Sequence, residues 1–166
     1  MKKEVYAKKK FGQNFLTDQN IISKILNIHQ LEGNKILEIG PGRGALTKEL
    51  VKQAKEVVAF EIDGDMINIL NKEIASDNFK LFHMDFLESD ISDFKDFLVI
   101  ANIPYYITSD IIFKLLDYRQ NFTAATLMVQ KEVAERIIAN KRISEIILVL
   151  VQNVFLLSSF MIKSTY

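Results

Sequence analysis

The stretch Lys35-Ile-Leu-Glu-Ile-Gly-Pro-Gly-Arg-Gly-Ala45 decides the fold of this 166-residue chain. Its first half is an apolar run typical of a buried strand, and its second half places three glycines at alternate positions before an amphipathic segment. Because glycine has no Cβ, Gly40, Gly42 and Gly44 can let the backbone approach a ligand closely, and the start of the following helix offers N–H groups. The stretch predicts a strand, a ligand-binding turn and a helix, although a tight loop without a ligand has the same composition.

Two acidic residues narrow the class of ligand. Glu38 lies two residues before the first glycine, and Glu61 ends the next apolar run, where a carboxylate can bind ribose hydroxyls. The predicted ligand therefore contains a sugar. Dinucleotide oxidoreductases and methyltransferases share such a turn, so these residues alone leave both NAD and S-adenosylmethionine open.

Strand-like and helix-like segments alternate along the chain. Strands are predicted at 35–39, 57–62, 79–84, 97–101 and 124–129, and helices at 46–54, 66–74, 110–116 and 132–139. A first helix is predicted after the possible caps Thr17 and Asp18 and before Gly33, with Ile21, Ile22, Ile25 and Leu26 on one face. This alternation predicts a doubly wound α/β fold whose mostly parallel sheet is covered by helices on both faces. Ligands of such folds bind at the carboxyl ends of the strands, where the glycine turn, Glu61, Asp85 and Asn102 all fall.

Composition excludes several classes of protein. Formal net charge is zero and 49% of the residues are apolar, which fits one folded domain, here 17–166 behind a basic arm and loop at 1–16. The chain has no cysteine and two histidines, so we expect neither disulfides nor a metal centre. No apolar segment follows the first lysines, and polar residues interrupt the apolar run 146–162, so we expect a soluble cytoplasmic protein.

Several short motifs stand in a fixed order along the chain: Phe11-Gly-Gln-Asn-Phe-Leu16, Glu38-Ile-Gly-Pro-Gly-Arg-Gly44, Glu61, Asp85, Asn102-Ile-Pro-Tyr105 and Gln130-Lys-Glu-Val133. In order and spacing they resemble the motifs of the ribosomal RNA adenine dimethyltransferases. The last motif favours the enzymes that modify small-subunit rRNA over the erythromycin-resistance enzymes that modify the large subunit.

The resemblance implies a class I, Rossmann-like methyltransferase that uses S-adenosylmethionine to dimethylate two adjacent adenosines near the 3′ end of 16S rRNA in the small subunit. It assigns the cofactor to Gln13, Asn14, Leu16, Gly40, Gly42, Glu61, Ile62, Asp85, Phe86 and Asn102. Glu61 would accept hydrogen bonds from both ribose hydroxyls, and Asp85 one from the adenine amine. Taken singly, Glu61 could equally be a helix cap and Asp85 a solvated carboxylate.

Catalysis is assigned to Asn102, Ile103, Pro104 and Tyr105. The side-chain carbonyl of Asn102 and the main-chain carbonyl of Ile103 can accept the N–H groups of the target amine, which localises its lone pair. Pro104 restrains Ile103, and Tyr105 can stack on a flipped adenine. Without the other motifs, the same tetrapeptide fits a plain strand-to-helix turn.

Six basic residues are candidates for RNA contacts. They are Lys8, Lys9, Lys10, Arg43, Lys131 and Arg136. Each could also be a solvated surface charge, and only the family resemblance favours the group.

Two departures from the family pattern accompany the match. Tyr106 stands where family members usually have Asn, and after Asn153 the sequence lacks the usual proline-rich loop, last strand and helical domain. We therefore expect a sheet without its final strand, and self-association through the uncovered edge. A non-catalytic rRNA-binding assembly factor, an inactive truncated domain and an NAD-dependent oxidoreductase remain alternatives.

Overall fold

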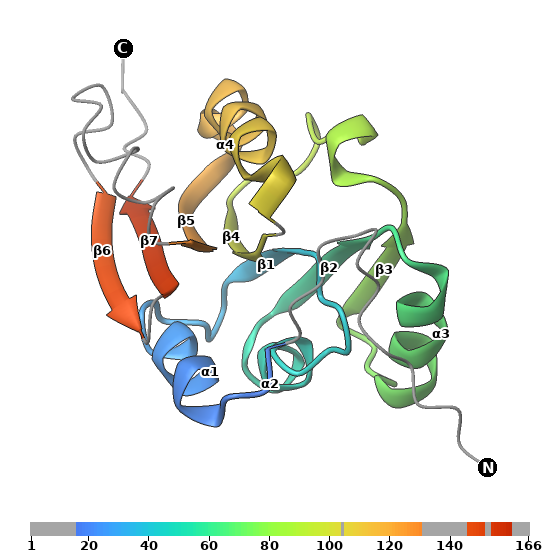
Figure 1. Ribbon diagram of the computed structural model, residues 1–166. Helices are drawn as coiled ribbons and strands as arrows, with labels where there is room; N and C mark the ends of the chain where they lie inside the picture. Colours follow the sequence, from blue (N-terminus) through green and yellow to red (C-terminus); the bar gives the residue numbers. More distant parts are fainter. Residues whose placement is uncertain (1–15, 104, 131–145, 152–153, 161–166) are drawn as a thin grey trace.

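A computed structural model describes residues 16–103, 105–130, 146–151 and 154–160 (Figure 1). In chain order the α-helices and strands are α1 Gln19–Leu26, β1 Lys35–Ile39, α2 Thr47–Gln53, β2 Glu56–Glu61, α3 Gly64–Glu73, β3 Phe79–His83, β4 Phe97–Asn102, α4 Thr108–Asp117, β5 Phe122–Gln130, β6 Ile146–Val151 and β7 Val154–Phe160. Short 3₁₀ turns η2 (Phe86–Glu88) and η3 (Tyr105–Ile107) follow β3 and β4. The described elements from α1 to β5 agree closely with those predicted, whereas β6 and β7 have no counterpart among the predicted strands, and the helix predicted at 132–139 lies outside the described residues.

The strands form one sheet in the order β3-β2-β1-β4-β5-β7-β6. The first five strands are parallel, and β7 runs antiparallel to both β5 and β6. The chain order reverses between β1 and β4, where an open α/β sheet binds its ligands. The predicted doubly wound, mostly parallel fold is confirmed.

Helices cover both faces of the sheet, as Figure 1 shows with α4 above it and α1 and α2 below. Ile111 and Leu115 of α4 pack with one apolar cluster of the sheet, whereas Ile22 of α1 and Leu50 of α2 pack with the other. Strand β1 supplies side chains to both clusters, which explains why apolar residues stand at consecutive positions in it, at Ile36 and Leu37.

The expectation that the sheet lacks its final strand is wrong. Strand β7 pairs with β5 from Ala124↔Phe160 to Gln130↔Val154, so the edge of β5 is covered, and β6 lies beyond it. The run 146–162, read from the sequence as an interrupted apolar segment, contains two antiparallel strands separated by two residues. The predicted self-association through an uncovered edge at β5 loses its basis.

Candidate functional site

The carboxyl ends of four neighbouring strands bring the predicted cofactor residues to one edge of the sheet. Gly40 follows β1, Glu61 ends β2, Asp85 lies two residues beyond β3, and Asn102 ends β4. These residues are far apart in sequence, and only parallel pairing of β3, β2, β1 and β4 places them together (Figure 1).

The glycine turn between β1 and α2 has the backbone geometry that its sequence predicts. Gly40, Gly42 and Gly44 have φ values of 69°, 56° and 75°, in the left-handed region that favours glycine. The Gly40 amide donates to the carbonyl of Phe60 at 3.0 Å. A Cβ on Gly40 would lie 3.6 Å from the carbonyl oxygen of Asn102, so it would occupy the space between the ends of β1 and β4.

Glu61 is fixed by backbone donors on two sides. Its side chain is 5% exposed, and its carboxylate accepts from the Gly42 amide at 3.0 Å and from the Asp63 amide at 2.9 Å. Burial raises the pKa of Glu61, which these amide donors oppose. The N-cap of α3 is Asp63, not Glu61, so the helix-cap reading of Glu61 is wrong. The carboxylate joins the glycine turn to the end of β2.

Glu38 is a buried acid that the sequence analysis did not assign to the site. It lies within β1 and is 2% exposed, and its Oε2 and the Oγ1 of the buried Thr47 have no hydrogen-bond partner among the described residues. Burial raises the pKa of Glu38 to about 8, and the charge of Glu61 adds to this shift. The sequence could have indicated that Glu38 is a buried acid, because it places a glutamate within a strand expected to be buried on both faces.

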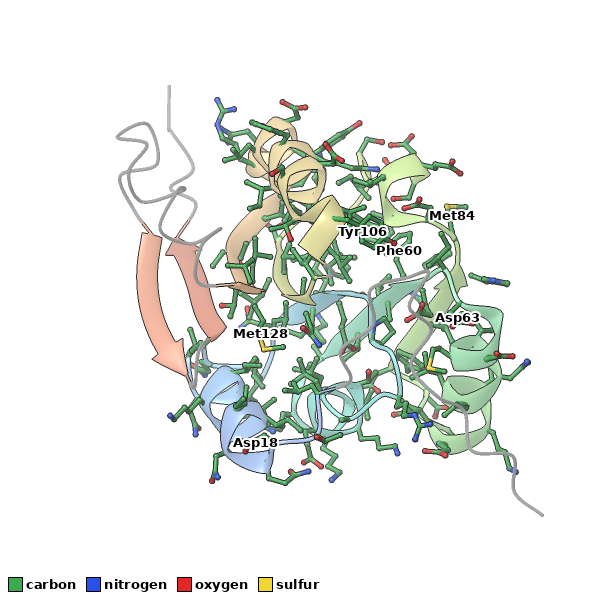
Figure 2. The ribbon with its side chains drawn as sticks, in the orientation of Figure 1. Asp18, Phe60, Asp63, Met84, Tyr106 and Met128 are labelled. Carbon is green, nitrogen blue, oxygen red and sulfur yellow. The ribbon has the colours of Figure 1, made fainter. Side chains whose placement is uncertain are left out.

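The residues around the end of β3 bring one carboxylate and several apolar side chains to the same edge of the sheet. Asp85 is half-buried and caps the turn η2, accepting from the Leu87 amide at 2.9 Å, so it is not a freely solvated carboxylate. Phe86 is buried beside Phe60, while Ile62 and Met84 are 46% and 44% exposed. Figure 2 shows Met84 beyond β3 and Asp63 at the start of α3. Apolar side chains thus flank the acidic groups at this edge.

The segment after β4 continues the sheet before it turns into α4. Ile103 is buried and its amide donates to the Met128 carbonyl of β5 at 3.3 Å. Asn102 is half-buried, Tyr105 begins the turn η3, and Tyr106 is 61% exposed (Figure 2). The ring at the position where the family usually has Asn is therefore not packed into the core.

The remaining predicted residues are only partly covered by the structure. Leu16 is half-buried and packs against the cluster under α1 and α2, and Arg43 is exposed in the glycine turn. Eight predicted site residues lie outside the described residues: Lys8, Lys9, Lys10, Gln13, Asn14, Pro104, Lys131 and Arg136, of which Pro104 is the one assigned to catalysis.

Neither a metal cluster nor a membrane-spanning helix is found in the part of the chain that the structure describes. No three of its histidine, aspartate and glutamate side chains are grouped to hold a metal ion. None of its helices is both long and apolar enough to cross a membrane.

Comparisons with known proteins agree on one family. The model of the family described as ribosomal RNA adenine dimethylase matches residues 5–159. A protein of Mycoplasmopsis pulmonis named ribosomal RNA small subunit methyltransferase A is 59% identical over 139 residues, covering 84% of this chain and 55% of the relative. The protein of that name from Clostridium botulinum is 44% identical over 150 residues, covering 87% and 54%. The chain thus spans about half the length of the curated relatives it matches.

Solved structures show the same architecture. A dimethyladenosine transferase from Plasmodium falciparum superposes with a TM-score of 0.77 at 27% identity, covering 89% of this chain and 63% of that one. The 23S rRNA methyltransferase ErmE has a TM-score of 0.73 at 24% identity, which is evidence of a shared fold alone.

Proposed function

The chain belongs to the ribosomal RNA adenine dimethylase family, and from this membership we propose that it is an S-adenosylmethionine-dependent methyltransferase acting on adenine N6 of small-subunit rRNA. The observation that carries the proposal is the meeting of the glycine turn, Glu61, Asp85 and Asn102 at one edge of the sheet. Two adjacent adenosines near the 3′ end of 16S rRNA are the proposed targets, since the relatives are named for the small subunit.

The residues at this edge fit S-adenosylmethionine. Gly40 leaves open the space that a Cβ would fill beside Asn102, so the backbone can lie against the methionine portion. Glu61 is already held by two amides, and each oxygen of a carboxylate can accept more than one hydrogen bond, so both ribose hydroxyls can bind it. Asp85 offers acceptors for the adenine amine, and the exposed Ile62 and Met84 supply apolar contact.

Methyl transfer to an exocyclic amine requires that its lone pair be localised and aimed. When bound, S-adenosylmethionine supplies an electrophilic methyl group on a sulfonium. The Asn102 side-chain carbonyl and the Ile103 main-chain carbonyl would accept the two N–H groups of the amine and favour its pyramidal form. The Ile103 amide donates to the Met128 carbonyl of β5 and so ties this segment to the sheet, and Tyr105 would stack on the extruded base.

The roles of the basic residues follow from family membership and charge. Arg43 lies exposed in the glycine turn, next to the proposed cofactor, where a phosphate of the target strand could bind it. Lys8, Lys9, Lys10, Lys131 and Arg136 are proposed to contribute further phosphate contacts. The arm 1–16 is proposed to cover the cofactor, and 17–166 to form the catalytic domain.

Replacement of Asn102 tests the proposed activity. Asn102→Ala should lower the rate of methyl transfer to unmethylated small-subunit particles by about 10²-fold or more, because the acceptor acts mainly on the transition state. Its dissociation constant for the same particles should stay within about twofold of the wild type. Transfer is measured with radiolabelled S-adenosylmethionine and binding by filter retention.

Asn68→Ala is the matched control, because Asn68 is an exposed amide on α3. It should leave both quantities unchanged. Equal losses of transfer and binding in Asn102→Ala would make Asn102 a docking residue. A wild-type chain that binds particles without any transfer would favour a non-catalytic assembly factor.

A further inference from the structure

Lys114 makes an unusual set of contacts for a half-buried lysine. It lies in the last turn of α4, and its ammonium donates to three main-chain carbonyls: Phe86 at 2.6 Å, Leu87 at 3.0 Å and Ser89 at 2.5 Å. An ammonium has three N–H donors, so this set satisfies all of them. The same nitrogen lies 4.9 Å from the centroid of the Phe86 ring.

The three carbonyls belong to Phe86 and Leu87 of η2 and to its C-cap Ser89. The N-cap Asp85 and the Phe86 amide lie at the start of the same turn. The N–H and C=O groups of a helical turn point in opposite directions along its axis, and the first amide has no acceptor within the turn. When Lys114 holds the carbonyl end, the Phe86 amide and the Asp85 carboxylate are left at the opposite end. A donor and an acceptor are thereby placed side by side, as the N1 and amine edge of adenine requires.

Helix α4, which carries Lys114, comes shortly after Asn102 and Ile103 in the chain. Turn η3 leads from that segment directly into α4, and Lys114 lies one and a half turns beyond the start of the helix. Partial burial lowers the pKa of Lys114, and the charges of Asp85 and Asp90 oppose that shift. The ammonium is therefore near the acidic residue proposed to read the purine, and on the element that carries the proposed methyl-transfer segment.

We propose that Lys114 is a positioning residue that fixes η2 so that Asp85 and Phe86 recognise the adenine of the cofactor. The inference rests on the proposed use of S-adenosylmethionine and extends it to a residue that touches neither the cofactor nor the RNA. Without Lys114 three carbonyls converge with no cation, and the turn relaxes away from the geometry that reads adenine.

Discrimination between two purines tests the proposal. S-adenosylhomocysteine and S-inosylhomocysteine differ at the purine edge, where an amine is replaced by a carbonyl and N1 gains a proton. Calorimetry gives the dissociation constants of both for the wild type, Lys114→Met, Lys114→Arg and Lys24→Met. Lys24 is the control because it is an exposed lysine in the last turn of α1.

In Lys114→Met we expect S-adenosylhomocysteine to bind about tenfold more weakly while the inosyl compound changes little, so the ratio of the two constants falls toward one. Lys114→Arg should retain part of the preference, because a planar guanidinium keeps the charge but cannot meet three converging carbonyls equally. Lys24→Met should match the wild type. The ratio does not depend on the fraction of protein that is folded.

Four other results would overturn the proposal. A lower affinity of Lys114→Met for both compounds at an unchanged ratio would mean general destabilisation. If circular dichroism showed both Lys114 variants to be unfolded, Lys114 would support the fold and not the purine site. A wild type that binds neither compound would refute the proposed cofactor, and the inference with it, whereas wild-type binding with no effect of Lys114→Met would refute the inference alone.

Discussion

At the scale of single residues, Glu38 should make the stability of the protein depend on pH. Its pKa is about 8 in the folded protein, because of burial, and an ordinary value near 4.5 applies in the unfolded chain. As pH rises between these values, the unfolded chain loses the Glu38 proton while the folded protein keeps it. The contribution of Glu38 to folding therefore becomes less favourable, by up to about 1.4 kcal/mol per pH unit.

Glu38→Gln should remove this contribution, so the variant should gain stability over the wild type as pH rises from 5 to 8, by about 2.5 kcal/mol between pH 5 and pH 7. Urea unfolding at a series of pH values measures the difference. Glu32→Gln, at an exposed position before β1, controls for the loss of one acidic group. A constant difference between Glu38→Gln and the wild type across this range would show that Glu38 is ionised in the folded protein.

At the scale of elements, the glycine turn is packed tightly against α3. A Cβ on Gly44 would lie 2.7 Å from Cδ2 of Leu70 and 3.1 Å from Cδ1 of Ile74, whereas nothing that the structure describes lies within 4 Å of a Cβ on Gly33. Both glycines have positive φ, 75° and 77°, so alanine strains the backbone at each by about 1–2 kcal/mol.

Gly44→Ala should therefore be destabilised more than Gly33→Ala, by about 1–3 kcal/mol, because the fully buried Leu70 would have to shift within a packed core. Chemical denaturation of the two variants measures the difference. Equal losses would mean that α3 shifts freely relative to the turn.

The sequence predicts the parallel part of the fold well and the antiparallel part poorly. Strands β1 to β5 are rich in apolar residues, and an α-helix separates each consecutive pair except β3 and β4, which η2 connects. In 146–162 the apolar residues show no clear period, so the pair β6 and β7 looks like one interrupted segment. A connection of two residues is short enough to join β6 and β7 as antiparallel neighbours. The sequence does not reveal that β7 also pairs with β5.

The candidate site likewise has a part that the sequence predicts and a part that it does not. Strand ends place Glu61, Asp85 and Asn102 correctly, because parallel pairing follows from the order of the elements. The contacts of Lys114 with η2 span more than twenty residues of sequence and involve main-chain carbonyls, which any residue type supplies. No sequence pattern marks such contacts. The roles assigned to the site residues stay predictions.

At the scale of the whole molecule, the charges balance at 21 basic and 21 acidic residues, so binding of a polyanion must depend on a local cluster. Five of the first ten residues are lysines, and Lys8, Lys9 and Lys10 lead into the segment proposed to cover the cofactor. If these three lysines bind phosphates, they contribute to RNA affinity mainly through counterion release.

Replacing Lys8, Lys9 and Lys10 together by alanine should reduce the slope of log affinity against log salt concentration by about 2–3, since each phosphate contact contributes about one. The control replaces Lys52, Lys55 and Lys80, three exposed lysines around the start of β2, so that net charge changes equally. Fluorescence anisotropy with a small-subunit rRNA fragment gives both slopes. If the two triple variants lost the same slope, overall charge would govern binding, and the N-terminal lysines would have no site of their own on the RNA.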